Sequence, residues 1–199
     1  MILAALVLAL AACSGAAATP SVMMLPGATP PPMGTRETAY SPARPAPALA
    51  LTDQDGNPFD LSSLKGTPVF VYFGYTHCPD VCPTTLADVR TAVQQAGIAA
   101  KLVMVTVDPA RDNTAWMKTY LDAYKAGFIG LTGTDAQIAA AAAAWSVSYR
   151  AEPADSNGNY VMDHTSDVYL VDASGMLRHH IFFGAGSTLI AQILRSVAN

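Results

Sequence analysis

The chain has 199 residues, of which 51% are hydrophobic and only 13% charged, and its 15 acidic and 11 basic side chains give a formal net charge of −4. A weakly acidic chain offers no broad basic surface for nucleic acid. The length suits one domain with an attached segment, since single cores run to about 100–200 residues. Three cysteines, Cys13, Cys78 and Cys82, are too few for a disulfide-stapled scaffold, and one is left over if two of them pair.

The N-terminal segment carries no charged side chain before Arg36. Residues 1–12 form an apolar run of the size of a signal-peptide core, far short of the roughly 20 residues needed to cross a bilayer. The run ends in LAACSG at residues 10–15, which resembles the lipobox of bacterial lipoproteins. We expect cleavage before Cys13, lipidation of Cys13, and a location in the cell envelope, where disulfides can persist. The alternative is a buried N-terminal helix with Cys13 as a small core residue.

Residues 13–47 have the composition of a flexible tether. Eight of the 14 prolines lie between Thr19 and Pro47, among Ala, Thr, Ser and Gly, and no apolar periodicity is visible there. Such a segment cannot bury enough surface to offset its ordering entropy, and it extends at about 3 Å per residue. Its methionines, Met23, Met24 and Met33, are soft donors that can touch Cu(I), although incidental placement is the simpler interpretation.

A compact domain is expected over residues 48–199, which is long enough for a hydrophobic core. Its apolar pattern alternates between buried strands and amphipathic helices. Strands are predicted at 68–74, 102–107, 129–131, 167–171 and 177–183. Helices are predicted at 83–96, from Asn113 or Thr114 to 124, from Thr134 or Asp135 to 145, and from Ser187 onward.

The order of these elements predicts the fold class. It is β-α-β-α followed by a helix, a hairpin and a helix, as in a thioredoxin-like α/β fold with one parallel and one antiparallel half of a central sheet. Residues 48–64, with Asp55 and Gly56 between two short extended pieces, predict an N-terminal β-hairpin extension, and residues 61–64 a single helical turn. A polar insertion at 152–159 precedes the C-terminal hairpin. No second domain is expected.

The reactive groups gather in GYTHCPDVCP at residues 74–83, where a buried strand passes into a helix. Residues four apart on a helical turn share one face, so Cys78 and Cys82 can address one ion or each other. A helix N-terminus also favours the thiolate, which binds metals and attacks disulfides. Because a proline interrupts a regular helix, we expect the helix to begin at Pro83, after an irregular turn.

The presence of a third ligand would distinguish a soft metal site from a redox pair of cysteines. The candidate is His164, in VMDHTS at residues 161–166, a loop that faces the cysteine turn in a thioredoxin-like fold. Two thiolates and one imidazole suit trigonal Cu(I), and imidazole accommodates either copper oxidation state, whereas zinc more often takes a fourth ligand. A core or surface histidine satisfied by hydrogen bonds is the alternative.

The cysteine motif GYTHCPDVCPTTL resembles the signature of the Sco/SenC family of copper-binding, membrane-tethered thioredoxin-like proteins. Further stretches are similar in order and spacing, namely VDPARD at 107–112, GLTG at 130–133, DHT at 163–165 and YLVD at 169–172. The resemblance covers the chain from about residue 48. It implies that Cys78, Cys82 and His164 bind copper, as Cu(I) and also as Cu(II).

The same resemblance implies a role in metallating the dinuclear copper centre of cytochrome c oxidase, by copper delivery, by reduction of the target's cysteines, or by both. Its implied partners are cytochrome c oxidase subunit II, other copper chaperones and, through Cys13, the membrane, with the chain itself a monomer.

Acidic and imidazole side chains near the motif have weaker assignments. His77 can stabilise a thiolate or hold copper transiently, or it can be structural. Asp80 can sit near the metal as a charge or be a solvated turn residue. Asp108 can orient a loop of the site or cap a turn, and Asp163 can hydrogen-bond the ring of His164 or shape its loop.

Two further histidines, His179 and His180, lie in sequence on one predicted strand. Successive side chains of a strand point to opposite faces, so the two cannot both address one site. Neither is expected to be a ligand.

Two functions from different classes remain open. The first is a copper metallochaperone that uses Cys78, Cys82 and His164. The second is a thiol-disulfide oxidoreductase or peroxidase in which Cys78 and Cys82 form a redox-active pair without metal. The two can coexist, since a disulfide between the cysteines would abolish copper binding.

Overall fold

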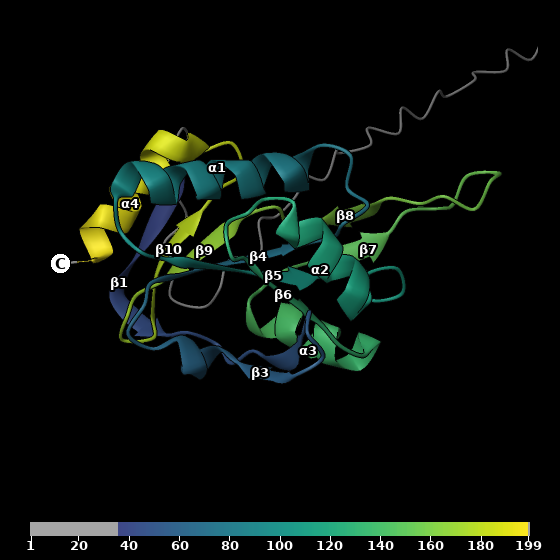
Figure 1. The fold of residues 1–199 in the computed structure, drawn as a ribbon, viewed down its shortest axis with the longest axis horizontal. Helices are drawn as coiled ribbons and strands as arrows, with labels where there is room; N and C mark the ends of the chain where they lie inside the picture. Colours follow the sequence, from purple (N-terminus) through teal and green to yellow (C-terminus); the bar gives the residue numbers. More distant parts are fainter. Residues whose placement is uncertain (1–35, 199) are drawn as a thin grey trace, which may run out of the picture.

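A computed structural model describes residues 36–198, so the expected signal peptide, Cys13 and most of the tether lie outside the described residues. An eight-stranded sheet forms the centre of the described part, in the order β1-β10-β9-β4-β5-β6-β2-β3 (Figure 1). Its strands are β1 Glu37–Pro45, β2 Ala50–Asp53, β3 Pro58–Asp60, β4 Val69–Gly74, β5 Lys101–Thr106, β6 Ile129–Thr132, β9 Val168–Val171 and β10 Met176–Ile181.

The sheet has a parallel and an antiparallel half. β4, β5 and β6 run parallel, with Tyr72 opposite Met104 and Met104 opposite Gly130. β9 and β10 run antiparallel to their neighbours on the other side of β4. The hairpin β2–β3 joins the edge beside β6, and the 3-10 helix Leu61–Leu64 follows it. The predicted thioredoxin-like fold with an N-terminal hairpin is therefore confirmed.

Helices cover both faces of the sheet. α1 (Val81–Ala96) and α4 (Gly186–Val197) lie side by side over one face (Figure 1). α2 (Thr114–Asp122) covers β6 on that face, where Met117 and Leu121 leave no room for a side chain at Gly130. α3 (Asp135–Ala144) covers the opposite face, and Asn113 and Thr134 cap α2 and α3 as predicted.

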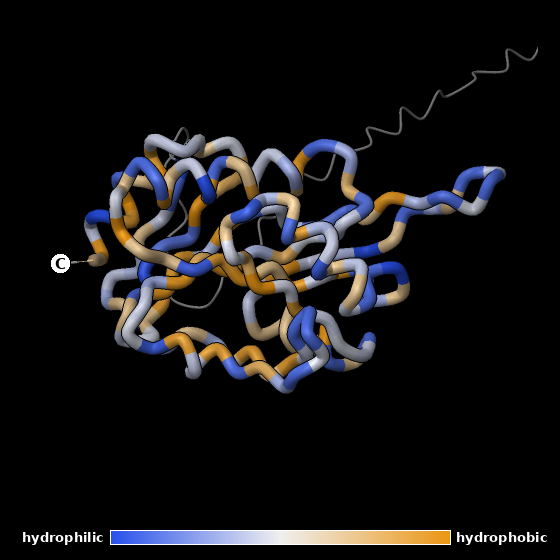
Figure 2. The backbone as a smooth tube through the Cα atoms, viewed as in Figure 1, coloured by the Kyte–Doolittle hydropathy of each residue, from blue (hydrophilic) through white to orange (hydrophobic). Residues whose placement is uncertain are grey.

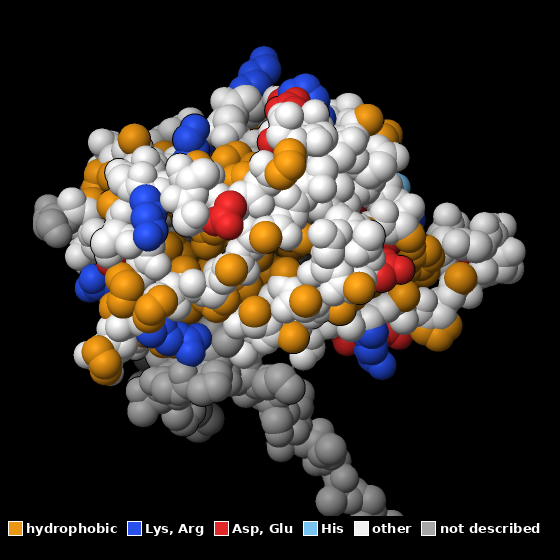
Figure 3. All heavy atoms as spheres, turned by 90° about the horizontal axis from the view of Figure 1, so that it is seen from below, with side chains coloured by type: hydrophobic (Ala, Val, Ile, Leu, Met, Phe, Trp, Pro, Cys, Tyr) orange, Lys and Arg blue, Asp and Glu red, His pale blue; other side chains and the backbone are white. Residues whose placement is uncertain are grey.

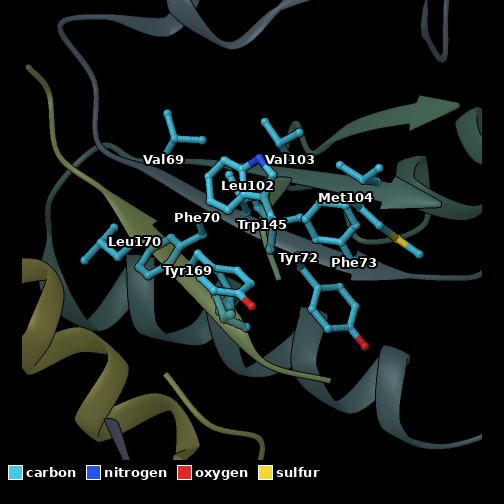
Figure 4. Packing of buried hydrophobic residues seen from close by; sticks show 14 of the residues in the cluster. Val69, Phe70, Tyr72, Phe73, Leu102, Val103, Met104, Trp145, Tyr169 and Leu170 are labelled. Carbon is cyan, nitrogen blue, oxygen red and sulfur yellow. The ribbon is translucent and has the colours of Figure 1, made fainter. Parts of the chain in front are cut away.

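The core is built on β4, whose six residues are all buried. Figure 4 shows Trp145 on one side of the sheet and the ring of Tyr72 on the other. Trp145 packs against Phe73 and Tyr169 with ring centroids 6.2 and 5.3 Å away. Figure 2 shows hydrophobic residues concentrated along these central strands. Because β4 is held on both faces and both edges, its carboxyl end is a rigid support for the loop that follows.

β1 is the largest departure from the sequence prediction. Residues 37–45 were assigned to the tether, yet they form an edge strand paired with β10, with Tyr40 buried. Prolines are tolerated on an edge strand, which has one unpaired side. The register shifts between Ala39 and Arg44, around Pro42. The proline content that suggested a tether is therefore compatible with the sheet, and the folded domain includes these residues.

α1 begins at Val81, two residues before the predicted start at Pro83. The expectation was wrong because Pro83 lies at the third helical position. The first four N–H groups of an α-helix have no intrahelical acceptor, so a proline there removes no hydrogen bond. Cys82 is consequently a helical residue, while Cys78 precedes the helix.

The polar insertion forms an arm that projects from the domain, drawn in green in Figure 1. β7 (Tyr149–Ala151) and β8 (Met162–His164) pair antiparallel at its base, with Tyr149 opposite His164. Its tip is hydrophilic in Figure 2. The sequence indicated the polar insertion but not this pairing, because each strand has only three residues.

No helix within residues 36–198 is long and apolar enough to cross a membrane. On the face seen in Figure 3, lysine and arginine side chains are scattered and form no continuous basic patch.

Candidate metal centre

The two cysteines lie where β4 passes into α1. Cys82 is fully buried, Cys78 is partly exposed, and both are free thiols. The backbone N–H of Cys82 donates to Cys78 Sγ at 3.3 Å. Asp80, the N-cap residue, makes no side-chain capping bond, so the sulfur of Cys78 satisfies an N–H group at the start of α1.

The two thiols differ in acidity. A hydrogen bond from the Cys82 side chain lowers the pKa of Cys78 to about 5, against the opposing effect of burial. The backbone N–H groups of Cys82 and Asp80, together with His164, add to the lowering. The same hydrogen bond and burial raise the pKa of Cys82. Cys78 is therefore the thiolate of the pair at neutral pH, and Cys82 retains its proton.

His164 lies at the end of β8, next to the buried thiol. Its Nδ1 is 3.0 Å from the carbonyl oxygen of Thr165, which can only accept, so Nδ1 carries the proton in the neutral ring. Nε2 then presents its lone pair 3.7 Å from Cys82 Sγ. The rings of Tyr72 and Tyr75 meet the imidazole edge-on at 6.3 and 5.7 Å and limit its rotation.

The donor geometry fits a shared metal between Cys82 and His164. Bonds of about 2.3 Å to sulfur and about 2.0 Å to nitrogen, at an angle near 120°, separate the two donors by about 3.7 Å. The described residues contain no group of three His, Cys, Asp or Glu side chains already gathered as a metal cluster. Cys78, four residues before Cys82, is the candidate third donor, and its sulfur accepts from the backbone N–H of Cys82.

Gly74, the last residue of β4, keeps space for the buried thiol. A methyl group there would lie 2.5 Å from the Tyr72 ring and 3.1 Å from Cys82 Sγ. We expect Gly74→Ala to destabilise the fold by about 1–3 kcal/mol, because neither the ring nor α1 can retreat within the packed core. Urea denaturation of the reduced protein measures the change. An unaltered unfolding midpoint would show that this space is not required.

A buried ion pair attaches the arm to the rest of the site. Arg111 donates to Asp108, which is 3% exposed, and to the carbonyl of Tyr160 at 2.9 Å. Tyr160 donates its hydroxyl to Asp108 at 2.8 Å, and the guanidinium lies 3.6 Å from the Tyr160 ring centroid. These contacts agree with the first of the two roles considered for Asp108, that of orienting a loop of the site. Tyr160 was not a predicted site residue, and its sole sequence signal is its place four residues before His164.

Asp163 does not reach the ring of His164. It pairs with Arg150 at 3.2 Å and is exposed, while the Thr165 carbonyl takes the hydrogen bond proposed for it. Period-two alternation along β8 explains the difference, since neighbouring side chains point to opposite faces. Of the two roles considered for Asp163, the arm-shaping one agrees with this contact.

His179 and His180 each pair with a carboxylate away from the cysteines. Nδ1 of His179 is 2.8 Å from Glu37, and Nε2 of His180 is 2.8 Å from Asp167. The structure brings neither to the cysteine pair.

His77 occupies a separate cluster beside Cys78. Its ring stacks on Trp116 of α2, with centroids 5.7 Å apart, and its Nδ1 faces Thr76 and Asp112. Trp116 was not a predicted site residue. Its signal was only an aromatic side chain in the first turn of a predicted helix.

One pocket of the described residues is remote from this chemistry. It has a volume of about 380 Å³ and lies at the opposite end of the sheet, between the start of β4, the end of β1 and the β9–β10 turn. It contains none of the predicted site residues. A pocket of about 310 Å³ does include His164, at the base of the arm.

Comparison with known proteins identifies a matching family and solved structures of similar fold. The SCO1/SenC family model matches residues 38–199. The SCO2-like protein of Rickettsia felis is 37% identical over 149 residues, which span 73% of each chain. The structure of Bradyrhizobium japonicum ScoI with copper bound is 35% identical with a TM-score of 0.68, over 75% of this chain and 97% of that one. Yeast Sco1 with copper bound is 29% identical with a TM-score of 0.68, over 77% and 88%.

These structures confirm the thioredoxin-like fold class, and the family model covers β1 almost entirely, in line with its place in the sheet. Because the match extends over nearly all of the described residues, the chain belongs to the SCO1/SenC family.

Proposed function

We propose that this protein is a copper metallochaperone that binds one copper ion through Cys78, Cys82 and His164. The observation that carries the proposal is the 3.7 Å approach of the unprotonated Nε2 of His164 to Cys82 Sγ. Soft thiolates select Cu(I), and an imidazole completes a trigonal set. The copper-bound structures of Bradyrhizobium japonicum ScoI and yeast Sco1 support the same cargo.

The chain's own residues prepare this site in distinct ways. Cys78 is already a thiolate at neutral pH and is the more accessible sulfur. Cys82 gives up its proton only when its sulfur binds the metal, so binding releases a proton. Thr165 fixes the tautomer of His164 through its carbonyl. Tyr72, buried beside Cys82, has a raised pKa because of burial, stays neutral and helps to exclude water.

Copper titration of the reduced full chain tests the proposal. We expect one Cu(I) per chain, and we expect His164→Ala to weaken its retention at least about tenfold while the fold stays intact. His179→Ala is the matched control, because His179 is held by Glu37 outside the site. Unchanged retention in His164→Ala would remove His164 from the ligand set.

The wider role we propose is assembly of the dinuclear copper centre of cytochrome c oxidase, with subunit II as acceptor and other copper chaperones as donors. Membrane attachment through lipidated Cys13 and a monomeric state belong to this proposal, which rests on the lipobox-like sequence and the family membership. Radiolabelled palmitate incorporation that is lost in Cys13→Ser tests the anchor. The comparisons do not favour the alternative of a metal-free thiol-disulfide oxidoreductase.

A further inference from the structure

His77 has its ring held by a buried hydrogen-bond network. Asp112, which is fully buried, accepts from the backbone N–H and hydroxyl of Thr76 at 3.0 and 2.6 Å, and from the hydroxyl of Thr106 at 2.7 Å. The indole N–H of Trp116 donates to the Thr76 hydroxyl at 2.7 Å. Nδ1 of His77 lies 3.1 Å from that hydroxyl and 3.4 Å from Asp112 Oδ1.

This network determines which nitrogen of His77 carries the proton. The hydroxyl of Thr76 has a single hydrogen, and the carboxylate of Asp112, which can only accept, takes it. The indole N–H of Trp116 can only donate, so it occupies an acceptor site of the same oxygen. Every partner of Nδ1 is therefore an acceptor. In the neutral ring of His77 the proton is on Nδ1, and Nε2 has a free lone pair.

The arrangement is the one that metal-binding histidines use. Such a histidine donates its second ring N–H to a carboxylate or another acceptor, which fixes the tautomer and raises the basicity of the free nitrogen. His164 has this arrangement with Thr165, and His77 has it with Thr76 and Asp112. The stacked indole of Trp116 further restricts the ring of His77.

Accessibility separates the two sulfurs that neighbour these imidazoles. The side chain of His77 is 38% exposed, and the next residue, Cys78, has the partly exposed sulfur of the pair. His164 instead faces Cys82, which is fully buried. A copper complex arriving from solvent therefore reaches the Cys78 sulfur, next to His77, before it can reach the Cys82 sulfur.

We infer that His77 Nε2 is a transient copper donor that works with Cys78 to take up and release the ion, outside the resting ligand set. This inference rests on the proposed metallochaperone function. Copper stays Cu(I) throughout: each bond to the donor complex is replaced by one to this protein, and the Cys82 thiol proton passes to solvent as its sulfur binds. His77 then leaves the coordination sphere.

The test compares kinetics with equilibrium in the reduced full chain. His77→Asn retains a side-chain donor toward Thr76 and Asp112 but lacks Nε2. We expect it to slow Cu(I) uptake from the bathocuproine disulfonate complex about tenfold, with final retention changed less than about threefold. His179→Asn is the matched control and should take up copper at the wild-type rate. If His77→Asn takes up Cu(I) at the wild-type rate and retains it, the inference about His77 is overturned while the proposed metallochaperone function stands.

A second measurement needs no copper. Nitrogen-15 NMR of the copper-free, reduced chain reports the tautomer of each neutral imidazole. We expect Nδ1–H and a bare Nε2 for His77, whereas an Nε2–H form would overturn the inference. Failure of the wild-type chain to retain Cu(I) would instead refute the proposed function, so the two failures are distinguishable.

Discussion

At pH 6, iodoacetamide is expected to alkylate Cys78 at least about a hundredfold faster than Cys82. The thiolate is the reactive form, and the pKa of Cys78 is lowered to about 5, so most of Cys78 is ionised at this pH. Cys82 is fully buried and its pKa is raised, so it stays protonated. Mass spectrometry of the two labelled peptides after short reaction times measures the ratio.

The pH dependence identifies the cause of this reactivity. Labelling of Cys78 should rise with a midpoint near pH 5 and level off at neutral pH, since a lowered pKa shifts ionisation to lower pH. Cys82→Ala removes the strongest hydrogen bond to the Cys78 sulfur and should move the midpoint upward. Cys78→Ser is the control for labelling at Cys82. Equal labelling of both cysteines, or a midpoint near the ordinary value of about 8.5, would contradict this account.

The second large effect is expected for Arg111→Met, with a loss of about 2–4 kcal/mol in the free energy of unfolding. The substitution keeps an unbranched apolar stem but removes the guanidinium, so Asp108 is left buried without its cation. It also removes the bond to the Tyr160 carbonyl that attaches the arm. Chemical denaturation measures the loss.

Hydrogen exchange locates the effect of Arg111→Met. Amides of β7 and β8 should exchange faster, and Cu(I) retention should fall, because His164 ends β8. Arg150→Met is the matched control: Arg150 is also on the arm, but its pairs with Glu152 and Asp163 are exposed and contribute little. Equal stability of the Arg111→Met and wild-type proteins, with unchanged exchange in the arm, would show that the ion pair does not hold the arm.

Most of the fold follows from local patterns in the sequence. The apolar runs of β4 and β5, the caps Asn113 and Thr134, and the turn before β10 were predictable because each depends on neighbouring residues. β1 was missed because its prolines are tolerated only through its edge position, which is a property of the sheet. The start of α1 was missed because Pro83 is tolerated only through its position in the first turn of the helix, where a backbone N–H has no intrahelical acceptor.

The cysteine pair and His164 were predictable as candidates from residue type, spacing and resemblance. The partners of the neighbouring groups were not, because they come from distant parts of the chain. Asp108 is hydrogen-bonded to Tyr160, which lies 52 residues further along the chain, and Thr76 is hydrogen-bonded to Trp116, which lies 40 residues further along. Side-chain direction on a three-residue strand also decided against a contact between Asp163 and the His164 ring.

The sequence by itself determined the kind of chemistry, because thiols and an imidazole at these positions restrict the ligand to a soft metal or a redox partner. It also determined the fold class through its hydrophobic periods. Only the tertiary structure decided which sulfur is the thiolate, which nitrogen of each histidine is free, and what holds the arm in place. These properties depend on burial and on hydrogen bonds between segments far apart in the chain, and local sequence patterns do not specify them.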